Sequence, residues 1–98
     1  MIGYLRGARD YHDAFEKNQG RPEVVDILAR TTGVRETSLY DRMVSSYMDP
    51  NGRMNVQALV DARDWFAANG YVPQKVDVQA LVDYQFVDYA VSVLGEYR

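Results

Sequence analysis

The segment that decides the fold is Tyr4–Phe15, which reads YLRGARDYHDAF. Its apolar and aromatic residues recur at steps of three and four positions, at Tyr4, Leu5, Ala8, Tyr11, His12 and Phe15. This spacing places them along one side of an α-helix. We therefore predict an amphipathic helix over about residues 4–17, ended by the segment Asn18–Arg21 with its glycine.

Two more helices are predicted in the first half of the chain. The second begins at Pro22, because proline suits the first helical position, and ends at Gly33. Its expected buried stripe consists of Val24, Val25, Ile27, Leu28 and Thr31. The third helix is expected to carry Leu39, Tyr40, Met43, Val44 and Tyr47.

The clearest turn in the chain is Asp49–Gly52. Its aspartate, proline and glycine stand at the positions that a type I β-turn favours. Asn55 then caps a fourth helix, which ends at Asn69-Gly70. That helix is expected to carry Val56, Leu59, Val60, Arg63, Phe66 and Ala67. An extended connector over Tyr71–Val76 follows, because a proline disfavours helix at the residue before it.

The last helical region is predicted to begin at the cap Asp77 and to reach Leu94. The hexapeptide VQALVD occurs twice, at Val56–Asp61 and at Val78–Asp83. Because the similarity stops there, we interpret it as one helix start used twice and not as a repeat architecture. Alternation typical of strands is weak throughout. The predicted fold is all-α, a small bundle of about five helices, with residues 1–98 as one helical domain or fragment.

The composition excludes several classes of protein. The 98 residues contain no cysteine, so a disulfide framework, a thiolate zinc site and a cysteine nucleophile are all excluded. No apolar run approaches the roughly 20 residues that cross a bilayer. A net charge of −3 argues against a broad nucleic-acid-binding surface. The first residues lack the layout of a signal peptide.

Neither of the two candidate chemical sites meets the requirements of its chemistry. His12 is the only histidine, and its neighbour Asp13 faces another way on a helix, so we interpret it as a partly buried structural residue. The segment Asp49–Asn55 resembles a calcium loop, but Met54 and Val60 occupy the positions that require glycine and glutamate. We therefore expect no enzyme activity, no catalytic or metal-binding residue and no cofactor.

Aromatic residues indicate an interaction surface. The chain has eight tyrosines, which suit interfaces because they combine an apolar ring with a hydroxyl. Trp65 stands beside Phe66, so only one of the two is expected to point inward. We expect the chain to self-associate through an apolar face of its first and last helices. The candidate interface residues are Tyr4, Tyr11, Trp65, Phe86 and Tyr89.

The segment Ile27–Met43 resembles the helix-turn-helix of bacterial repressors. Ala29 lies in the first helix, Gly33 at the turn and Leu39 in the second helix. A recognition helix should present hydrogen-bond donors to bases and phosphates, whereas the charges here are nearly balanced. DNA binding therefore stays open as an alternative function, beside a free-standing helical interaction module.

Taken end to end, the chain resembles the C-terminal part of a family of transport proteins. These are the nitrate/sulfonate/taurine-type substrate-binding proteins of ABC importers, which include the relatives of thiamine-pyrimidine synthases. The resemblance covers about residues 4–98 and is carried by Leu5–Phe15, Arg21–Leu28, Thr32–Val34, Asp49–Val56, Asp64–Phe66, Gly70–Val72, Val76–Val78, Leu81–Asp83 and Phe86–Val91.

The resemblance implies a role in solute uptake. Members of the family have two α/β lobes with the ligand cleft between them, and both lobes would lie upstream of Met1. The chain would then be a non-catalytic helical segment that supports a lobe, with none of the family's solute-contacting residues. The parent would bind a small solute in the periplasm and deliver it to the permease. The implied partners are these lobes and the permease, with no nucleic acid and no insertion into the membrane.

Overall fold

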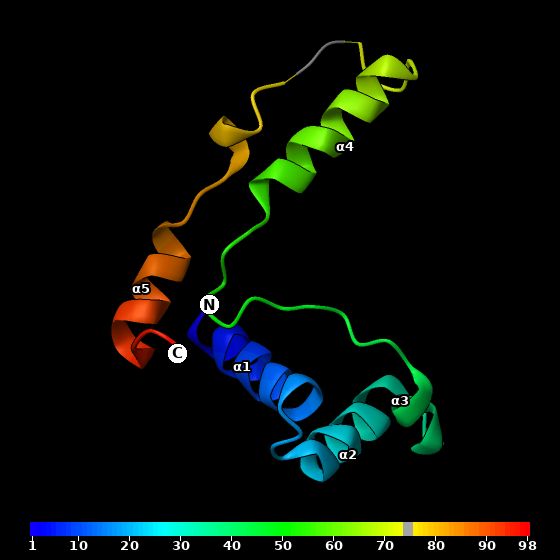
Figure 1. Ribbon diagram of the computed structural model, residues 1–98. Helices are drawn as coiled ribbons and strands as arrows, with labels where there is room; N and C mark the ends of the chain where they lie inside the picture. Colours follow the sequence, from blue (N-terminus) through cyan, green and yellow to red (C-terminus); the bar gives the residue numbers. More distant parts are fainter. Residues whose placement is uncertain (74–75) are drawn as a thin grey trace.

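The computed structural model describes residues 1–73 and 76–98, and its regular structure is helical (Figure 1). The elements are α1 (Ile2–Glu16), α2 (Arg21–Thr32), α3 (Ser38–Arg42), α4 (Val56–Ala68), the short 3₁₀ helix η1 (Gln79–Leu81) and α5 (Gln85–Leu94). No strand occurs among these described residues. The prediction of an all-α chain with about five helices is confirmed.

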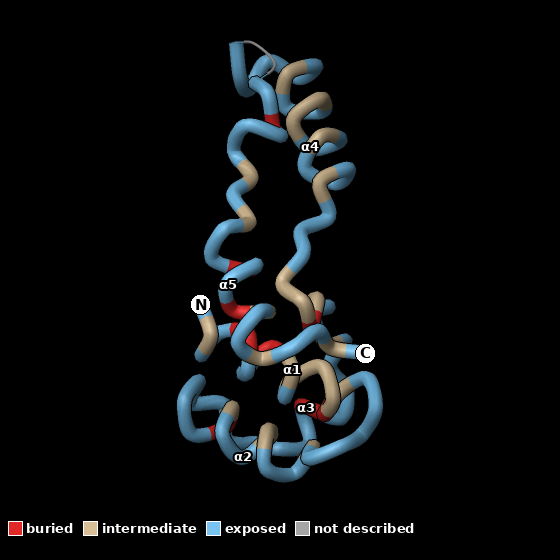
Figure 2. The backbone as a smooth tube through the Cα atoms, turned by 90° about the vertical axis from the view of Figure 1, so that its left-hand side faces the viewer, coloured by how far each residue is buried: buried red, intermediate tan, exposed pale blue. Residues whose placement is uncertain are grey.

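The core is small and centres on α1, which packs against α2 and α5. Figure 2 shows the buried positions gathering where α1 meets α5, while most of the remaining chain is exposed or half-buried. The buried apolar residues are Leu5, Ala8, Ala14, Ala29, Tyr40, Val78, Val87 and Ala90. Leu5 is the one large side chain among the described residues that is fully buried, so few side chains hold the helices together.

The molecule is open in shape. In Figure 1, α4 and η1 extend away from the three helices of the core, and we call these two elements the arm. The radius of gyration is 16.9 Å, against about 13 Å for a compact domain of this length. The guanidinium of Arg63 on α4 donates a hydrogen bond of 2.8 Å to the carbonyl of Val76, which lies shortly before η1. No residue of α4 is fully buried, and its apolar residues are half-buried or exposed.

Local signals placed several helix ends correctly. Pro22 lies in the first turn of α2, and Gly33 ends that helix in the left-handed conformation. Asn55 caps α4, because its Oδ1 accepts a hydrogen bond of 3.1 Å from the amide of Ala58. In the predicted connector, Gln74 and Lys75 lie outside the described residues, and the other positions are non-helical.

The predicted third helix is too long, because α3 ends at Arg42 and Tyr47 lies in non-helical chain. The carbonyl of Tyr40 accepts a hydrogen bond of 3.2 Å from the guanidinium of Arg21. A side chain thus satisfies a carbonyl that a further helical turn would have used. Met43 then adopts an extended backbone with ψ of 148°.

The predicted last helix is interrupted. Val82 is extended, with ψ of 121°, and separates η1 from α5. Asp83 restarts the helix, since its carboxylate accepts hydrogen bonds from both the backbone and the side-chain amide of Gln85 at 3.0 and 2.6 Å. The first copy of the repeated hexapeptide is therefore helical throughout, whereas the second is 3₁₀ helix followed by extended chain. Both copies begin a helical turn behind a polar side chain, because Asp77 accepts a hydrogen bond of 3.1 Å from the amide of Gln79 as Asn55 does from the amide of Ala58. The second copy does not continue as an α-helix, so the two starts lead to different structures.

Candidate functional site

His12 lies among aromatic rings and not in a catalytic arrangement. Its ring meets the rings of Tyr47 and Tyr97 edge-on, at centroid distances of 6.0 and 5.5 Å. Its Nδ1 is buried and has no hydrogen-bond partner in the described chain. A general base needs an orienting partner for one ring nitrogen, so this geometry supports the packing role that the sequence indicated.

The Asp49–Gly52 turn forms as predicted. The amide of Gly52 donates a 2.9 Å hydrogen bond to the carbonyl of Asp49. The Asp49 carboxylate accepts from the amides of Asn51 and Arg53 at 2.8 and 3.2 Å. This carboxylate therefore holds the turn together. No group of three side chains suited to a metal occurs in residues 1–73 and 76–98.

The turn is joined to both ends of the chain by a polar network that the sequence did not reveal. Arg9 donates to the carbonyls of Pro50 and Gly95, at 2.9 and 2.6 Å. The side chain of Asn51 exchanges two hydrogen bonds with the backbone of Tyr97, at 2.8 and 3.2 Å. The Tyr97 hydroxyl also donates to the carboxylate of Asp13. We call these residues, Arg9, Asp13, Asn51 and Tyr97, the clasp.

Lys17 extends the clasp at the end of α1. Its ammonium lies 4.5 Å from the centroid of the Tyr97 ring and 3.9 Å from the Asp13 carboxylate. Hydrogen bonding to the Tyr97 hydroxyl raises the pKa of Lys17; desolvation opposes it, and the charges of Tyr97 and Asp13 each add a smaller increase. These contacts tie Lys17 to the clasp.

The predicted interface residues do not form one surface. Tyr4 on α1 is 62% exposed, and Trp65 is 55% exposed on the arm. Phe86 and Tyr89 are also exposed and share one side of α5. Tyr11 is half-buried and packs on Phe15 with ring centroids 4.6 Å apart. The structure thus places Phe86 and Tyr89 on one side of α5, Tyr4 and Tyr11 on one side of α1, and Trp65 on the arm, so the five residues form no single surface.

The far end of the arm carries an aromatic cluster of Trp65, Phe66 and Tyr71. Trp65 stacks on Tyr71 at 5.7 Å with an interplanar angle of 14°, and Phe66 meets both rings edge-on. Trp65 is exposed, as the sequence suggested, whereas Phe66, expected on the apolar stripe of the helix, is 45% exposed as well. Among the described residues no other helix packs closely against α4, so neither ring is covered.

The glycine that ends α4, Gly70, indicates from sequence why Tyr71 lies against Phe66. Gly70 has φ of +74°, and the amides of Gly70 and Tyr71 bond to the carbonyls of Ala67 and Phe66. These are the two hydrogen bonds of a Schellman motif, which commonly brings together the apolar residues that correspond to Phe66 and Tyr71.

α5 exposes a continuous apolar stripe. Phe86, Tyr89 and Val93 follow one another at steps of three and four, and each is more than half exposed. The adjoining side of the helix, with Val87 and Ala90, is buried. α1 covers only one side of an apolar arc that runs more than halfway around the helix. We call Phe86, Tyr89 and Val93 the α5 stripe.

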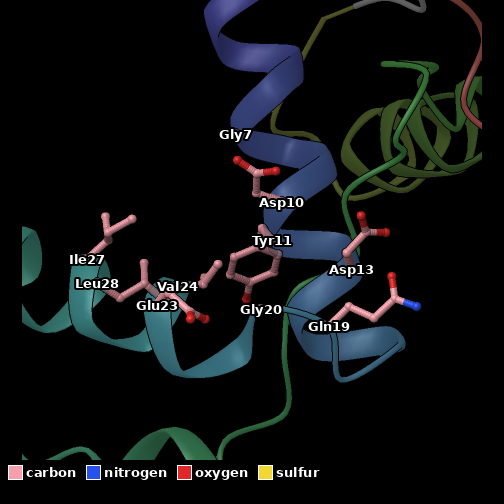
Figure 3. Close-up of a pocket in the computed structure, with 10 residues that line it drawn as sticks. All are labelled: Gly7, Asp10, Tyr11, Asp13, Gln19, Gly20, Glu23, Val24, Ile27 and Leu28. Carbon is pink, nitrogen blue, oxygen red and sulfur yellow. The ribbon is translucent and has the colours of Figure 1, made fainter.

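A groove of about 430 Å³ lies between α1 and α2 (Figure 3). Gly7, Asp10 and Tyr11 form part of the α1 wall, while the α2 wall includes Val24 and Ile27. In Figure 3 the ring of Tyr11 points toward α2. Apolar side chains such as Val24, Ile27 and Leu28 line the groove together with the carboxylates of Asp10, Asp13 and Glu23.

No close contact in the described part of the chain explains the two glycines of α1, Gly3 and Gly7. A Cβ built on Gly3 or Gly7 would meet nothing within 4 Å, and neither residue has a positive φ. Glycine inside a helix is less favourable than alanine by about 1 kcal/mol. The two glycines leave part of the α1 backbone without side chains, and they lower the stability of the helix.

The helix pair that resembles a helix-turn-helix has a very short second member. α3 contains five residues, and its central Tyr40 is buried with its hydroxyl bonded to the carbonyl of Val34 at 3.0 Å. Arg35 precedes this helix, and Arg42 ends it beside Asp41. This arrangement leaves little surface that could enter a DNA groove.

Comparison of the chain with protein-family models, with curated proteins and with solved structures gives no match. Within residues 1–73 and 76–98, no helix combines the length and the hydropathy that spanning a bilayer requires.

Proposed function

We propose that this chain acts without catalysis, as the helical C-terminal part of an ABC-importer solute-binding protein that packs on the protein's α/β lobes. The observation that carries the proposal is the α5 stripe. A helix that is apolar around most of its circumference is suited to burial on both sides, and α1 covers only one. Exposed apolar strips of this kind mark surfaces that bind another polypeptide.

The open shape of the molecule supports the same role. The arm exposes Leu59 and the aromatic cluster, and α4 contributes no fully buried residue. A free-standing helical module should close a core of its own, whereas Leu5 is the one large side chain fully buried in the described residues. These features favour helices that are completed by a larger neighbouring surface.

In this proposal the solute site lies in the lobes, together with the contacts to the permease, and the periplasm is the compartment of the whole protein. The chain alone should then bind no solute. Calorimetry with nitrate, taurine, alkanesulfonates and hydroxymethylpyrimidine is expected to show no heat of binding. A micromolar affinity for one of them would contradict this division of roles.

The direct test is reassembly with the lobes. The α/β lobes of a nitrate- or taurine-binding protein, purified without their own C-terminal helices, are titrated with this chain. We expect micromolar association, weakened at least tenfold by Tyr89→Ser. Val44→Ser is the control, because Val44 is 97% exposed and lies outside the helices and both proposed contacts. Absence of association, or an equal loss with both variants, would contradict the proposal.

DNA binding is the second candidate function, and its sole support is the resemblance of Ile27–Met43 to a helix-turn-helix. The five-residue α3 and its buried Tyr40 do not favour it. A mobility-shift assay with mixed duplex DNA at low salt should show no shift at micromolar concentration. A salt-dependent shift would favour this candidate over the transport role.

A further inference from the structure

We propose that the groove between α1 and α2 receives α1 of a second copy of this chain. The two α1 helices would cross antiparallel about a two-fold axis. The N-terminal half of each would then lie between α1 and α2 of the other copy. This contact is separate from the α5 stripe, which stays free for the lobes.

The charges of α1 complement themselves in this arrangement. Arg6 and Asp10 lie one turn apart on the same flank, and neither side chain has a hydrogen bond or ion pair in the described chain. In an antiparallel pair related by a two-fold axis, each flank faces the same flank of the other helix. An axis near Ala8 places Arg6 of each copy opposite Asp10 of the other. One contact thus forms two ion pairs, which fix the register.

The aromatic residues fit the same register. Tyr4 and Tyr11 lie on the other flank of α1, and the same axis places each Tyr4 opposite Tyr11 of the other copy. Tyr4 is 62% exposed in the single chain. In the pair its ring would reach the apolar α2 wall beside Val24 and Ile27, of which Ile27 is 50% exposed. The pairing of Tyr4 with Tyr11 and the pairing of Arg6 with Asp10 therefore require nearly the same position of the two-fold axis.

The surface between these flanks permits close approach. Gly3 and Gly7 lie one turn apart on α1, and Gly7 lines the groove itself. The space at both Cα atoms is open to 4 Å. Without Cβ atoms, the backbones of two helices can come nearer than larger residues allow. This accounts for Gly3, in the first turn of α1, and Gly7, in its interior, which no contact in the described residues explains.

The first test is the mass of the full chain in solution. Sedimentation equilibrium at micromolar concentration should give about twice the monomer mass of 11.2 kDa. Gly7→Leu should weaken association at least tenfold, because its side chain fills the space that the second helix needs. The monomer should remain folded, since leucine favours helix and meets no atom within 4 Å at its Cβ.

Ala58→Leu is the matched control, because it adds leucine to an exposed position of α4. It should leave the mass of the assembly unchanged. A wild-type chain that stays monomeric at 100 μM, or a Gly7→Leu variant that still forms the dimer, would overturn the proposal.

A second test uses the absence of cysteine from the sequence. Gly7→Cys should form an intermolecular disulfide under mild oxidation, because the two positions face each other near the axis. Glu16→Cys, at the far end of α1, should remain reduced at the same protein concentration. Equal cross-linking of both variants would indicate random collision and would overturn the proposal.

Charge exchange tests the register and separates this contact from the α5 stripe. Arg6→Asp should weaken the dimer at least fivefold, and the double variant Arg6→Asp/Asp10→Arg should restore it. Tyr89→Ser should leave the dimer intact while it weakens binding to the lobes. A dimer lost with Tyr89→Ser would place the contact on α5 and overturn the α1 proposal, without bearing on reassembly with the lobes.

Discussion

Replacement of Leu5 by alanine tests whether the fold depends on one contact between α1, α5 and the turn. Leu5 is fully buried, and a Cβ placed on Gly52 would lie 3.4 Å from its Cδ1 and 3.1 Å from a methyl of Val87. The three residues therefore meet at one point. Truncation of a buried leucine costs about 2–5 kcal/mol, and we expect the lower part of this range, because a thin core can relax around the cavity.

This cost is large for a chain of 98 residues, whose total stability is expected to be about 5–15 kcal/mol. Each kcal/mol shifts the melting temperature of such a domain by about 4–8 °C, so a loss of about 2–3 kcal/mol predicts a fall of roughly 10–20 °C. Circular dichroism at 222 nm during heating measures the shift, and urea unfolding gives the free energy directly.

Leu81→Ala is the matched control for this prediction. It removes the same atoms from a side chain that is 74% exposed, so its effect should stay below about 0.5 kcal/mol. Equal destabilisation by Leu5→Ala and Leu81→Ala would refute the reasoning, because the core would then not be centred on α1.

Three further predictions concern single local interactions. Asn55→Ala removes the 3.1 Å hydrogen bond that caps α4 and should lower the free energy of unfolding by about 0.5–2 kcal/mol. Asn55→Ser should retain the cap, so equal urea midpoints for the two variants would contradict its role. Gly52→Ala should lower the free energy of unfolding in urea by more than about 1 kcal/mol, because Gly52 has φ of +72° and the new Cβ would lie 3.1 Å from a methyl of Val87. A neutral effect would contradict the turn geometry. Hydrogen bonds from Gln85 lower the pKa of Asp83 below its usual 3.8, so its contribution should be present above about pH 4 and lost as the pH falls through the folded-state pKa. Asp83→Asn should remove that part of the acid dependence of the melting temperature, and parallel pH profiles for the two proteins would contradict it.

The features that sequence predicted correctly are those decided by neighbouring residues. The Asp49–Gly52 turn and the cap at Asn55 each depend on hydrogen bonds within four residues, so the local residue types specify them. Gly33 ends α2 for the same kind of reason. Helix type followed from apolar spacing, which local sequence also contains.

The features that sequence did not predict depend on distant residues. α3 stops early because of Arg21, which lies 19 positions before the carbonyl that it binds. The clasp joins residues 41 to 86 positions apart, and nothing in the spacing of Arg9, Asn51 or Tyr97 indicates their contact. The exposure of both Trp65 and Phe66 likewise depends on the direction of the arm, which no local pattern fixes.

The repeated hexapeptide provides a measurement that few chains allow. Val56–Asp61 and Val78–Asp83 have the same six side chains, so their intrinsic preferences for helix are equal and cancel when the two are compared. One is helical, whereas the other passes from 3₁₀ helix into extended chain. Carbonyl and Cα chemical shifts of each pair of matching residues would report the two helix populations in one sample. Each population gives an equilibrium constant between helix and non-helix, and the ratio of the two constants gives the free energy that residues outside the hexapeptide supply to its conformation.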